Sequence, residues 1–582
     1  MIRTNNPNQT TFIDPCEEMG PKRKKMPKKS WAYFFRHHIL PELPVERVGK
    51  HFSSFGRPSK ELYTSLGVML LRQTFDMTDQ ETLAQLAFDS QWHYALNIVF
   101  VDDDSAYMCE KTLYNSRNII LQNNLWDILF DRVTDSPIQK FGVDTSRQRL
   151  DSTHIKSNMR SLGRIGIFSR TIHKFLSNLK RRQRALFDRL PKRLVSKYTK
   201  KEQLSAFSMV KPSESQKTLK SLTRDLYQLI RQFEHRPNVR RFNSFILLQR
   251  VFSEQCRIVR KGNDANHTAV AAEPIPSKRV SSDSLQNPSD PDATCDGHKG
   301  KGYRVQVMET WSEDKTPDQP NPIACVAVET AHRHDSKAVV PAIEATERRG
   351  VKPKELPTDS LYGSDDNVQH AKRQGVTLIS PALKGAGKTD TLRLGDFRFD
   401  GKNRIAFCRN DRQPISQRIE KDVAIAEFNP AHCQSCPLRS KCPVKDSKEN
   451  TYIRHTAKEV RLARRRQYEG TTAFIEKYAF RAGVEATMSE FKQVTGVNRL
   501  RVRGLKAVSF CATLKALGLN ILRSAKAFFN LNGCPTRPCD ALLFHDRSLL
   551  SVVSQGLLLT HCLIATILRL RFNFLGYYLR PN

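Results

Sequence analysis

The pattern of hydrophobic and polar positions changes its period about halfway along the chain. In the first half apolar residues recur at helical spacing, first within residues 56–135, where Leu62–Leu70 presents one apolar face. Thr78 and Glu81 then have the spacing of a capping box, which indicates the start of another helix. We therefore expect a small helical domain, either a simple packed bundle or a module that presents a helix to a DNA groove.

Residues 160–260 also have helical periodicity, but they carry a large excess of positive charge. Between Lys174 and Lys201 there are eleven Lys and Arg residues and one acid, Asp188, with leucines interleaved. Such a run is usually a solvated helix face, although its one-sided sign favours contact with phosphates. Residues 261–300 are rich in Ser, Pro, Asp, Asn and Gly, so we expect a loop there.

Beyond residue 300 the apolar positions alternate as in strands. Residues 303–310 and 324–330 predict two paired strands. The pattern then alternates between helix and strand, with a helix from Asp335, a strand at 356–360, a helix at 365–374 and a strand at 376–379. This succession predicts a mixed α/β sheet.

Composition narrows the classes of function. The 582 residues include 95 Lys and Arg against 59 Asp and Glu, a formal charge of +36, which predicts a polyanionic partner such as nucleic acid. The 39% of hydrophobic residues exclude a wholly disordered chain. Thirteen cysteines form no regular framework and the first twenty residues contain no apolar leader, so we expect a reducing cytoplasm.

The two ends of the chain carry separate expectations. The basic run at residues 21–29 indicates a solvated tail that ends near residue 50. Residues 548–568 contain no Asp, Glu, Lys or Arg over 21 positions, which is long enough to span a bilayer. Because Ser, Thr, Gln and His interrupt this stretch, a buried amphipathic helix is favoured, and we expect no membrane partner.

Three acids have settings that suit chemistry. Asp151 ends a short extended segment, and Asp359 lies where the strand at 356–360 enters a turn. Ligands of α/β sheets gather at the carboxyl ends of strands, so these two acids can share a site, although either alone could be a helix cap or a turn aspartate. The third acid, Glu485, lies on a helix predicted from about 472 to 494.

The helix that carries Glu485 can be examined by its geometry. Gly496 is expected to close it. At 100° per residue, four side chains share a stripe of roughly 60°, namely Tyr478, Arg481, Glu485 and Lys492. A simple Arg–Glu ion pair four residues apart would explain only two of them. An acid between cations on one face suits a metal ligand beside a bound phosphate backbone.

The spacing Tyr478-x2-Arg481-x3-Glu485-x6-Lys492 resembles the tyrosine–arginine–glutamate–lysine signature of DDE transposases from bacterial insertion sequences. The likeness covers roughly residues 45–525. Further stretches are similar to that family, namely Phe55–Ser59, Leu150–His154, Asp290–Tyr303 and Asp359–Gly363.

The resemblance implies an RNase H-like catalytic core, in which Asp151, Asp359 and Glu485 bind two Mg²⁺ or Mn²⁺ ions. Carboxylates suit these hard cations, and a pair of ions can activate the attacking oxygen and stabilise the leaving one. Water would cut the ends of the element, and a freed 3′-hydroxyl would then attack target DNA. Arg481 and Lys492 would bind phosphates and Tyr478 would contact the DNA. The family also implies a dimer or larger complex on double-stranded DNA, in the cytoplasm with the nucleoid.

The resemblance divides the chain into a core and its additions. The basic segment 160–260 must be an insertion, because the 208 positions between Asp151 and Asp359 exceed what the core needs. The expected order is a basic flexible tail (1–50), a helical DNA-binding domain (51–140), a first part of the core (141–159), a basic helical insertion (160–260), a loop (261–300), a second part of the core (301–394), a Cys-containing insertion (395–455), a third part of the core (456–525) and a C-terminal extension (526–582).

A group of cysteines lies between the second and third acids. Cys433 and Cys436 have the two-residue spacing of a zinc knuckle, and Cys408 and Cys442 would complete four thiolate ligands of a structural Zn²⁺. His432 is an alternative ligand. Because the gap to Cys408 is long, the four cysteines can equally be interpreted as unligated cytosolic thiols.

The sequence therefore predicts a metal-dependent DNA transposase that acts at the terminal inverted repeats of its own element. Two rivals stay open: a metal-dependent nuclease that cuts without joining, and a non-catalytic DNA-binding protein derived from a transposase. The presence of all three acids counts against the second rival.

Overall fold

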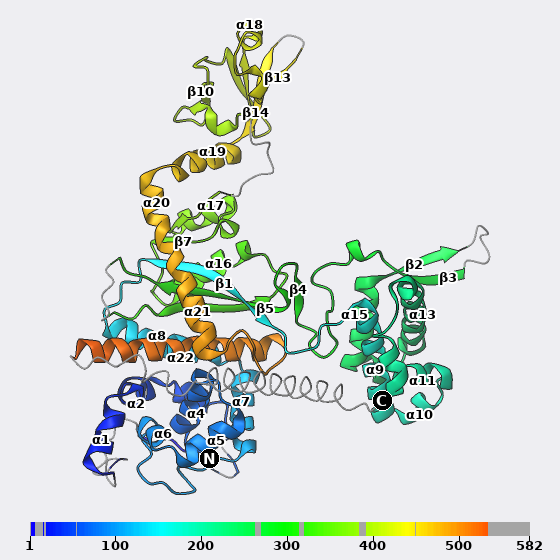
Figure 1. Cartoon of the computed structure of the whole chain (residues 1–582), viewed down its shortest axis with the longest axis vertical. Helices are drawn as coiled ribbons and strands as arrows, with labels where there is room; N and C mark the ends of the chain where they lie inside the picture. Colours follow the sequence, from blue (N-terminus) through cyan, green and yellow to red (C-terminus); the bar gives the residue numbers. More distant parts are fainter. Residues whose placement is uncertain are drawn as a thin grey trace, which may run out of the picture.

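The structure is a computed structural model of the chain. It describes residues 2–5, 16, 19–53, 55–56, 58–261, 269–313, 319–382, 391–447 and 450–532. A mixed sheet lies at the centre, N-terminal helices lie below it, a helical insertion lies to one side, and a small second sheet lies at the far end (Figure 1). The uncharged stretch at 548–568 lies outside the described residues.

The central sheet is mixed, as the alternating strand and helix patterns predict. Its strands are β1 (Gln148–Lys156), β4 (Thr294–Asp296), β5 (Gly300–Thr310), β6 (Ile323–Thr330), β7 (Glu355–Pro357) and β8 (Thr377–Ile379). β5 is antiparallel to β1, β4 and β6, whereas β7 is parallel to β8. Bridges from Arg147 to Glu355 and from Leu150 to Thr358 place β7 parallel to β1. The strand order is therefore β6-β5-β1-β7-β8, with β5 reversed relative to the other four.

Both faces of this sheet are buried, which explains its apolar strands. Along β5, Val305 and Val307 enter one core and Met308 enters another. The second core lies under α16 (Val339–Arg348) and α17 (Asp365–Arg373). On the other face the sheet packs against α22 (Leu505–Leu531).

The last of the N-terminal helices lies alongside α22 near the sheet, and the others pack on the opposite side of α22 from the sheet (Figure 1). They are α1 (Pro21–Lys28), α2 (Trp31–Phe34), α3 (Val45–Gly49), α4 (Leu62–Thr74), α5 (Asp79–Phe88), α6 (Ser90–Ala95), α7 (Glu110–Gln122) and α8 (Trp126–Lys140). The capping box predicted from Thr78 and Glu81 is confirmed at the start of α5. One continuous core joins these helices, α22 and one face of the sheet.

The structure differs from the expected flexible tail at residues 1–50. Residues 21–49 form α1, α2, a π-helical turn (Phe35–Ile39), a 3-10 turn (Leu40–Glu42) and α3. Phe34 and Phe35 are fully buried in the core, and burial of these aromatic side chains holds the segment that follows the basic run in place. His38 lies against the ring of Phe528, where burial, Lys140 and His37 lower the pKa of its imidazole to about 4.

The basic segment after β1 is a separate helical body. Its helices are α9 (Arg164–Arg182), α10 (Arg184–Asp188), α11 (Lys192–Thr199), α12 (Lys201–Ala206), α13 (Ser215–Phe233), α14 (Pro237–Arg240) and α15 (Asn243–Gln255). Its own core includes Leu176 and Leu179, as their interleaving with cations predicts. The expected single loop at 261–300 is wrong in part, since β2 (Cys256–Lys261) pairs with β3 (Ala269–Pro274) and β4 joins the central sheet.

The Cys-containing segment forms a small domain that lies away from the central sheet (Figure 1). Its elements are β9 (Arg398–Phe399), β10 (Ile405–Phe407), β11 (Ser416–Glu420), β12 (Val423–Phe428), α18 (Pro430–Gln434), β13 (Lys445–Asp446) and β14 (Thr451–Thr456). The chain returns to the sheet through α19 (Ala457–Glu469), α20 (Thr472–Ala479) and α21 (Gly483–Thr495).

Among the described residues, α22 is the one helix whose length and apolar composition would allow it to cross a membrane. In the most apolar window of this helix, 72% of the residues are buried inside the protein. A central core helix passes the same test, and the packing of α22 between the sheet and α4 is that of a core helix.

Candidate active site

Asp151 and Asp359 lie side by side on neighbouring parallel strands. Asp151 lies inside β1 and not at the end of an extended segment as expected, because pairing with β5 continues the strand to Lys156, and Asp359 lies two residues after the end of β7. The bridge between Leu150 and Thr358 puts the two acids at the same level, one residue further along each strand. In each case one carboxylate oxygen accepts a hydrogen bond from the next backbone N–H, at 2.7 Å for Asp151 and 2.6 Å for Asp359.

The environment of Asp151 opposes its negative charge. Burial is the largest effect and raises the pKa of this carboxyl above its ordinary value. The N–H of Ser152 and the guanidinium of Arg481 lower the pKa, whereas the nearby charges of Asp359 and Asp335 raise it. A positive charge brought close to Asp151 would therefore stabilise the ionised form of its carboxyl group.

Arg481 links Glu485 to Asp151. Its Nη2 donates to Oδ2 of Asp151 at 3.0 Å, and its Nη1 donates to Oε1 of Glu485 at 3.2 Å. Burial opposes the charge of Arg481, but Asp151, Tyr478, Asp359 and Glu485 together raise its pKa. The Glu485 side chain is 70% exposed, so this acid lies at the open side of the group.

The helix predicted over 472–494 is interrupted. α20 ends at Ala479, a 3-10 turn spans Phe480–Ala482, and α21 starts at Gly483. Arg481 lies in this turn, which directs its side chain towards β1. The predicted end of the helix is confirmed, because Gly496 has φ 64° and caps α21.

A second arginine explains why the turn occurs here. Nη1 of Arg149, on β1, donates to the carbonyl oxygen of Phe480 at 3.0 Å. The same guanidinium lies against Gly483, where a Cβ atom would collide with it. A side chain at position 483 would therefore displace this guanidinium from its contacts with Phe480 and Glu309.

A buried glutamate fixes α21 against the sheet and α22. Glu309 of β5 is fully buried and accepts hydrogen bonds from Nε of Arg149 at 2.6 Å and from the Thr487 hydroxyl at 2.6 Å. Nη1 of Arg523, on α22, is 3.1 Å from the same carboxylate. These contacts join four elements, β1, β5, α21 and α22, and set the position of the helix that carries Glu485. The sequence signal for this network is Glu309 itself, a charged residue on the same strand face as the buried Val305 and Val307.

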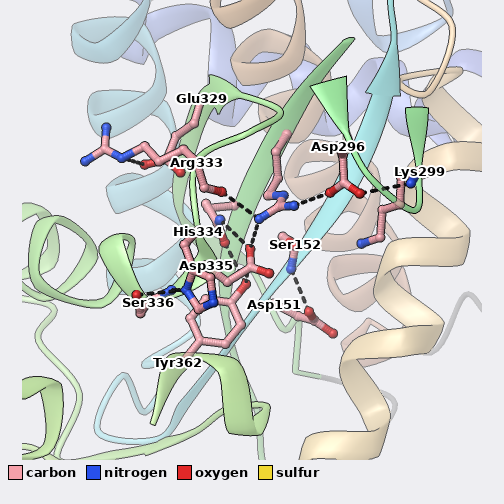
Figure 2. A network of polar contacts seen from close by, with 12 residues as sticks. Asp151, Ser152, Asp296, Lys299, Glu329, Arg333, His334, Asp335, Ser336 and Tyr362 are labelled. Atoms are coloured by element: carbon pink, nitrogen blue, oxygen red, sulfur yellow. Dashed lines mark hydrogen bonds and ion pairs between the residues drawn. The ribbon is translucent and has the colours of Figure 1, made fainter. Parts of the chain in front are cut away.

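Another polar network lies beside Asp151 (Figure 2). Arg304 pairs with Asp335 at 2.9 Å and also with Asp296. The amide of Gln306 donates to Asp335, and the Tyr362 hydroxyl donates to Gln306 at 2.7 Å. Since Tyr362 ends the 3-10 turn (Ser360–Tyr362) that Asp359 caps, this network fixes the turn after the second acid.

Of the two other predicted DNA-contacting residues, Tyr478 lies near the acids and Lys492 lies further along α21. Tyr478 is stacked on Phe474 with 5.4 Å between ring centroids, and burial raises the pKa of its hydroxyl, with Arg481 opposing and Asp359 adding to the shift. Lys492 is in the last turn of α21, on the same face as Glu485 and two turns further on.

A basic groove lies on the helical insertion. It has a volume of about 780 Å³ and contains Arg170, Lys174, Arg181, Arg182 and Arg241 among the residues that form its walls. None of its lining residues, all within the described part of the chain, is Asp or Glu. Part of the cationic run between Lys174 and Lys201 therefore shares one surface with Arg170 and Arg241.

The donor chemistry of the three acids fits hard divalent cations. Within the described residues, no three His, Cys, Asp or Glu side chains are gathered closely enough to bind a metal ion. At Asp151 and Glu485 the reason is the position of Arg481, whose guanidinium already bonds both carboxylates.

Fold and site together define a mixed α/β protein with two acids on neighbouring parallel strands, Asp151 within β1 and Asp359 just after β7. Residues 408–525 match the family model described as a transposase DDE domain, which supports a transposase of the DDE type. This segment, about a fifth of the chain, contains Glu485 but neither Asp151 nor Asp359.

No curated protein matches the chain. Among solved structures, a cryo-EM structure of the piggyBac transposase synaptic complex with hairpin DNA is similar at 9% identity, with a TM-score of 0.22. The likeness covers 66% of this chain and 71% of that one. At this TM-score it carries no argument about the fold.

Proposed function

We propose that this protein is a DNA transposase with an RNase H-like core, which cleaves and joins DNA strands at the terminal inverted repeats of an insertion sequence. The observation that carries the proposal is the placement of Asp151 and Asp359 at neighbouring parallel strands, with Glu485 linked to Asp151 by Arg481. The mixed strand order and the match to a transposase DDE domain support it.

Asp151, Asp359 and Glu485 would hold the Mg²⁺ or Mn²⁺ ions of such an enzyme. Two ions bound there would polarise the scissile phosphate, activate the attacking oxygen and stabilise the leaving oxygen. The carboxylates themselves supply this binding, and Glu309 and Tyr362 keep their helix and turn in place.

Arg481 has two alternative partners in this proposal. In the protein alone its positive charge relieves the repulsion between Asp151 and Glu485. A DNA phosphate offers the same guanidinium two charged acceptors, so Arg481 can exchange a carboxylate for a phosphate oxygen. Lys492 would contact the next phosphates along the strand, and the ring of Tyr478 would pack beside the cleaved position.

The rest of the proposal concerns partners and location. The +36 charge and the basic groove of the insertion support binding of double-stranded DNA, both element ends and target. We infer a dimer or larger complex on DNA, because such reactions pair two ends, and a cytoplasmic location at the nucleoid.

A strand-transfer assay tests the proposal. Purified protein is incubated with Mg²⁺ or Mn²⁺, labelled terminal repeats and a plasmid target. Asp151→Asn, Asp359→Asn and Glu485→Gln should each abolish cleavage and joining while leaving DNA binding largely intact. Asp366→Asn, at an exposed acid in the first turn of α17, is the matched control and should keep full activity.

The same assay decides between the rivals. Cut ends without joined products would indicate a nuclease, and a retarded but intact DNA band would indicate a binding protein. Strand transfer that persists in any of the three acid variants would overturn the assignment of the site.

A further inference from the structure

The small domain between residues 391 and 456 contains four cysteines that come together in space. Cys408 follows β10, Cys433 lies on α18, Cys436 follows that helix, and Cys442 follows a 3-10 turn (Arg439–Lys441). All four are free, partly buried and on the wall of one cavity of about 30 Å³. We name them the four-cysteine cluster. Chain segments 25 residues apart in sequence thus deliver their thiols to a space large enough for one small ion.

The local backbone has the form of a metal knuckle. The N–H of Cys436 donates to the carbonyl oxygen of Cys433 at 3.3 Å, so the chain between them makes a tight turn. At Cys408 a second turn is closed by its N–H on the carbonyl oxygen of Arg412 at 2.9 Å. Two turns that face one another, each offering sulfur, are the usual frame of a structural zinc site.

The chemistry of the cavity selects a soft cation. None of the described residues that line the cavity is Asp or Glu. Hard cations therefore have no carboxylate ligands there. Arg412 and Arg439 line the same cavity. Their charges would balance the net charge of −2 that four thiolates around a divalent ion carry.

The domain also needs a stabilising element beyond its apolar core. That core consists of six buried residues, against which Cys408, Cys433 and Cys442 pack, namely Phe397, Ile405, Ala426, Phe428, Val444 and Ile453. A core of this size rarely stabilises a domain without a metal or a disulfide.

We propose that the four-cysteine cluster binds one structural Zn²⁺, independently of the proposed catalysis. The four sulfur atoms do not converge on one point in the structure, because no three His, Cys, Asp or Glu side chains among the described residues lie close enough together to bind one ion. The proposal requires the cysteine side chains to rotate between staggered positions about their Cα–Cβ bonds when the ion binds. His432 lines the cavity as well, but four thiolates leave no place for it as a ligand.

The measurement is metal content and cobalt spectroscopy of the full chain. Protein purified without chelators should contain about one zinc per chain by elemental analysis. After removal of zinc, added Co²⁺ should give the intense sulfur-to-cobalt absorption and the visible bands of a tetrahedral four-thiolate site. Cys433→Ser and Cys442→Ser should lose stoichiometric zinc. Cys109→Ser, at an exposed cysteine far from the cluster, and His432→Ala should retain it with an unchanged cobalt spectrum.

Several outcomes would overturn the proposal. They are absence of both zinc and a cobalt spectrum in the wild-type chain, zinc retained in Cys433→Ser, and a disulfide between cluster cysteines in mapped peptides. Loss of zinc from His432→Ala would replace the four-thiolate site by one with histidine, and so overturn it as stated. The cobalt spectrum is measured on the wild-type chain. The proposal can therefore be tested even if a serine variant folds poorly.

Discussion

The substitution Glu309→Gln tests whether the buried network positions the third acid. Glu309 has no exposed surface and faces two arginines, Arg149 and Arg523. Removing one partner of a buried ion pair costs about 3–5 kcal/mol. Because Arg523 keeps a second carboxylate, Glu490 at 2.6 Å, we expect the lower end, about 3 kcal/mol. Because the body that contains Glu309 is larger than 250 residues, the melting temperature should fall by less than the roughly 6–12 °C expected for 150–250 residues.

Urea unfolding followed by tryptophan fluorescence measures this loss. The four tryptophans, Trp31, Trp92, Trp126 and Trp311, lie in or against the body formed by the N-terminal helices and the sheet, so the signal reports that body. Glu476→Gln makes the same chemical change at an exposed position of α20 and should stay within about 0.5 kcal/mol of wild type. An unfolding midpoint for Glu309→Gln equal to that of the control would refute the reasoning.

Three further predictions follow from other parts of the structure. Arg181→Glu, in the basic groove, should weaken DNA binding and reduce the salt dependence of the binding constant by about one phosphate contact, whereas Lys217→Glu, exposed on α13 outside the groove, should not. Since the pKa of His38 is lowered to about 4, the unfolded chain takes up its proton first as pH falls, so stability should decline between about pH 6.5 and 4, and less so in His38→Gln. Gly483→Ala should cost about 1–3 kcal/mol in urea unfolding, whereas Gly163→Ala, whose added Cβ meets nothing within 4 Å, should be tolerated. The first prediction is contradicted if Arg181→Glu and Lys217→Glu show equal salt slopes of DNA binding. The second is contradicted if wild type and His38→Gln show equal pH profiles of stability, and the third if the two glycine variants unfold at equal urea midpoints.

The sequence predicted the strands and helices of the sheet because their patterns are local. The alternation in residues 303–310 and 324–330 became β5 and β6, and the strand at 376–379 became β8. Pairing between distant segments has no such local signal. Nothing in the spacing of 208 residues between Asp151 and Asp359 shows that β1 and β7 lie side by side.

The break in the helix of Glu485 could not be predicted for a related reason. Helical periodicity continues through Phe480–Ala482, and the agent that alters the backbone there, Arg149, comes from a strand more than 300 positions earlier. The expected role of Arg481 as a phosphate ligand rested on its place in a stripe. The structure adds its contacts to two carboxylates, which only the three-dimensional approach of β1 could provide.

The central position of α22 has a consequence for synthesis of the protein. α4 lies on one side of this helix and β6 on the other, yet α22 is made some 430 residues after α4. At 5–20 residues per second, the apolar side of α4 waits roughly 20–90 s on the ribosome for its partner. During that interval the nascent chain exposes the apolar surface of α4, which can aggregate. The yield of correctly folded protein should therefore depend on translation speed and on chaperones that cover α4 until Leu505–Leu531 emerges.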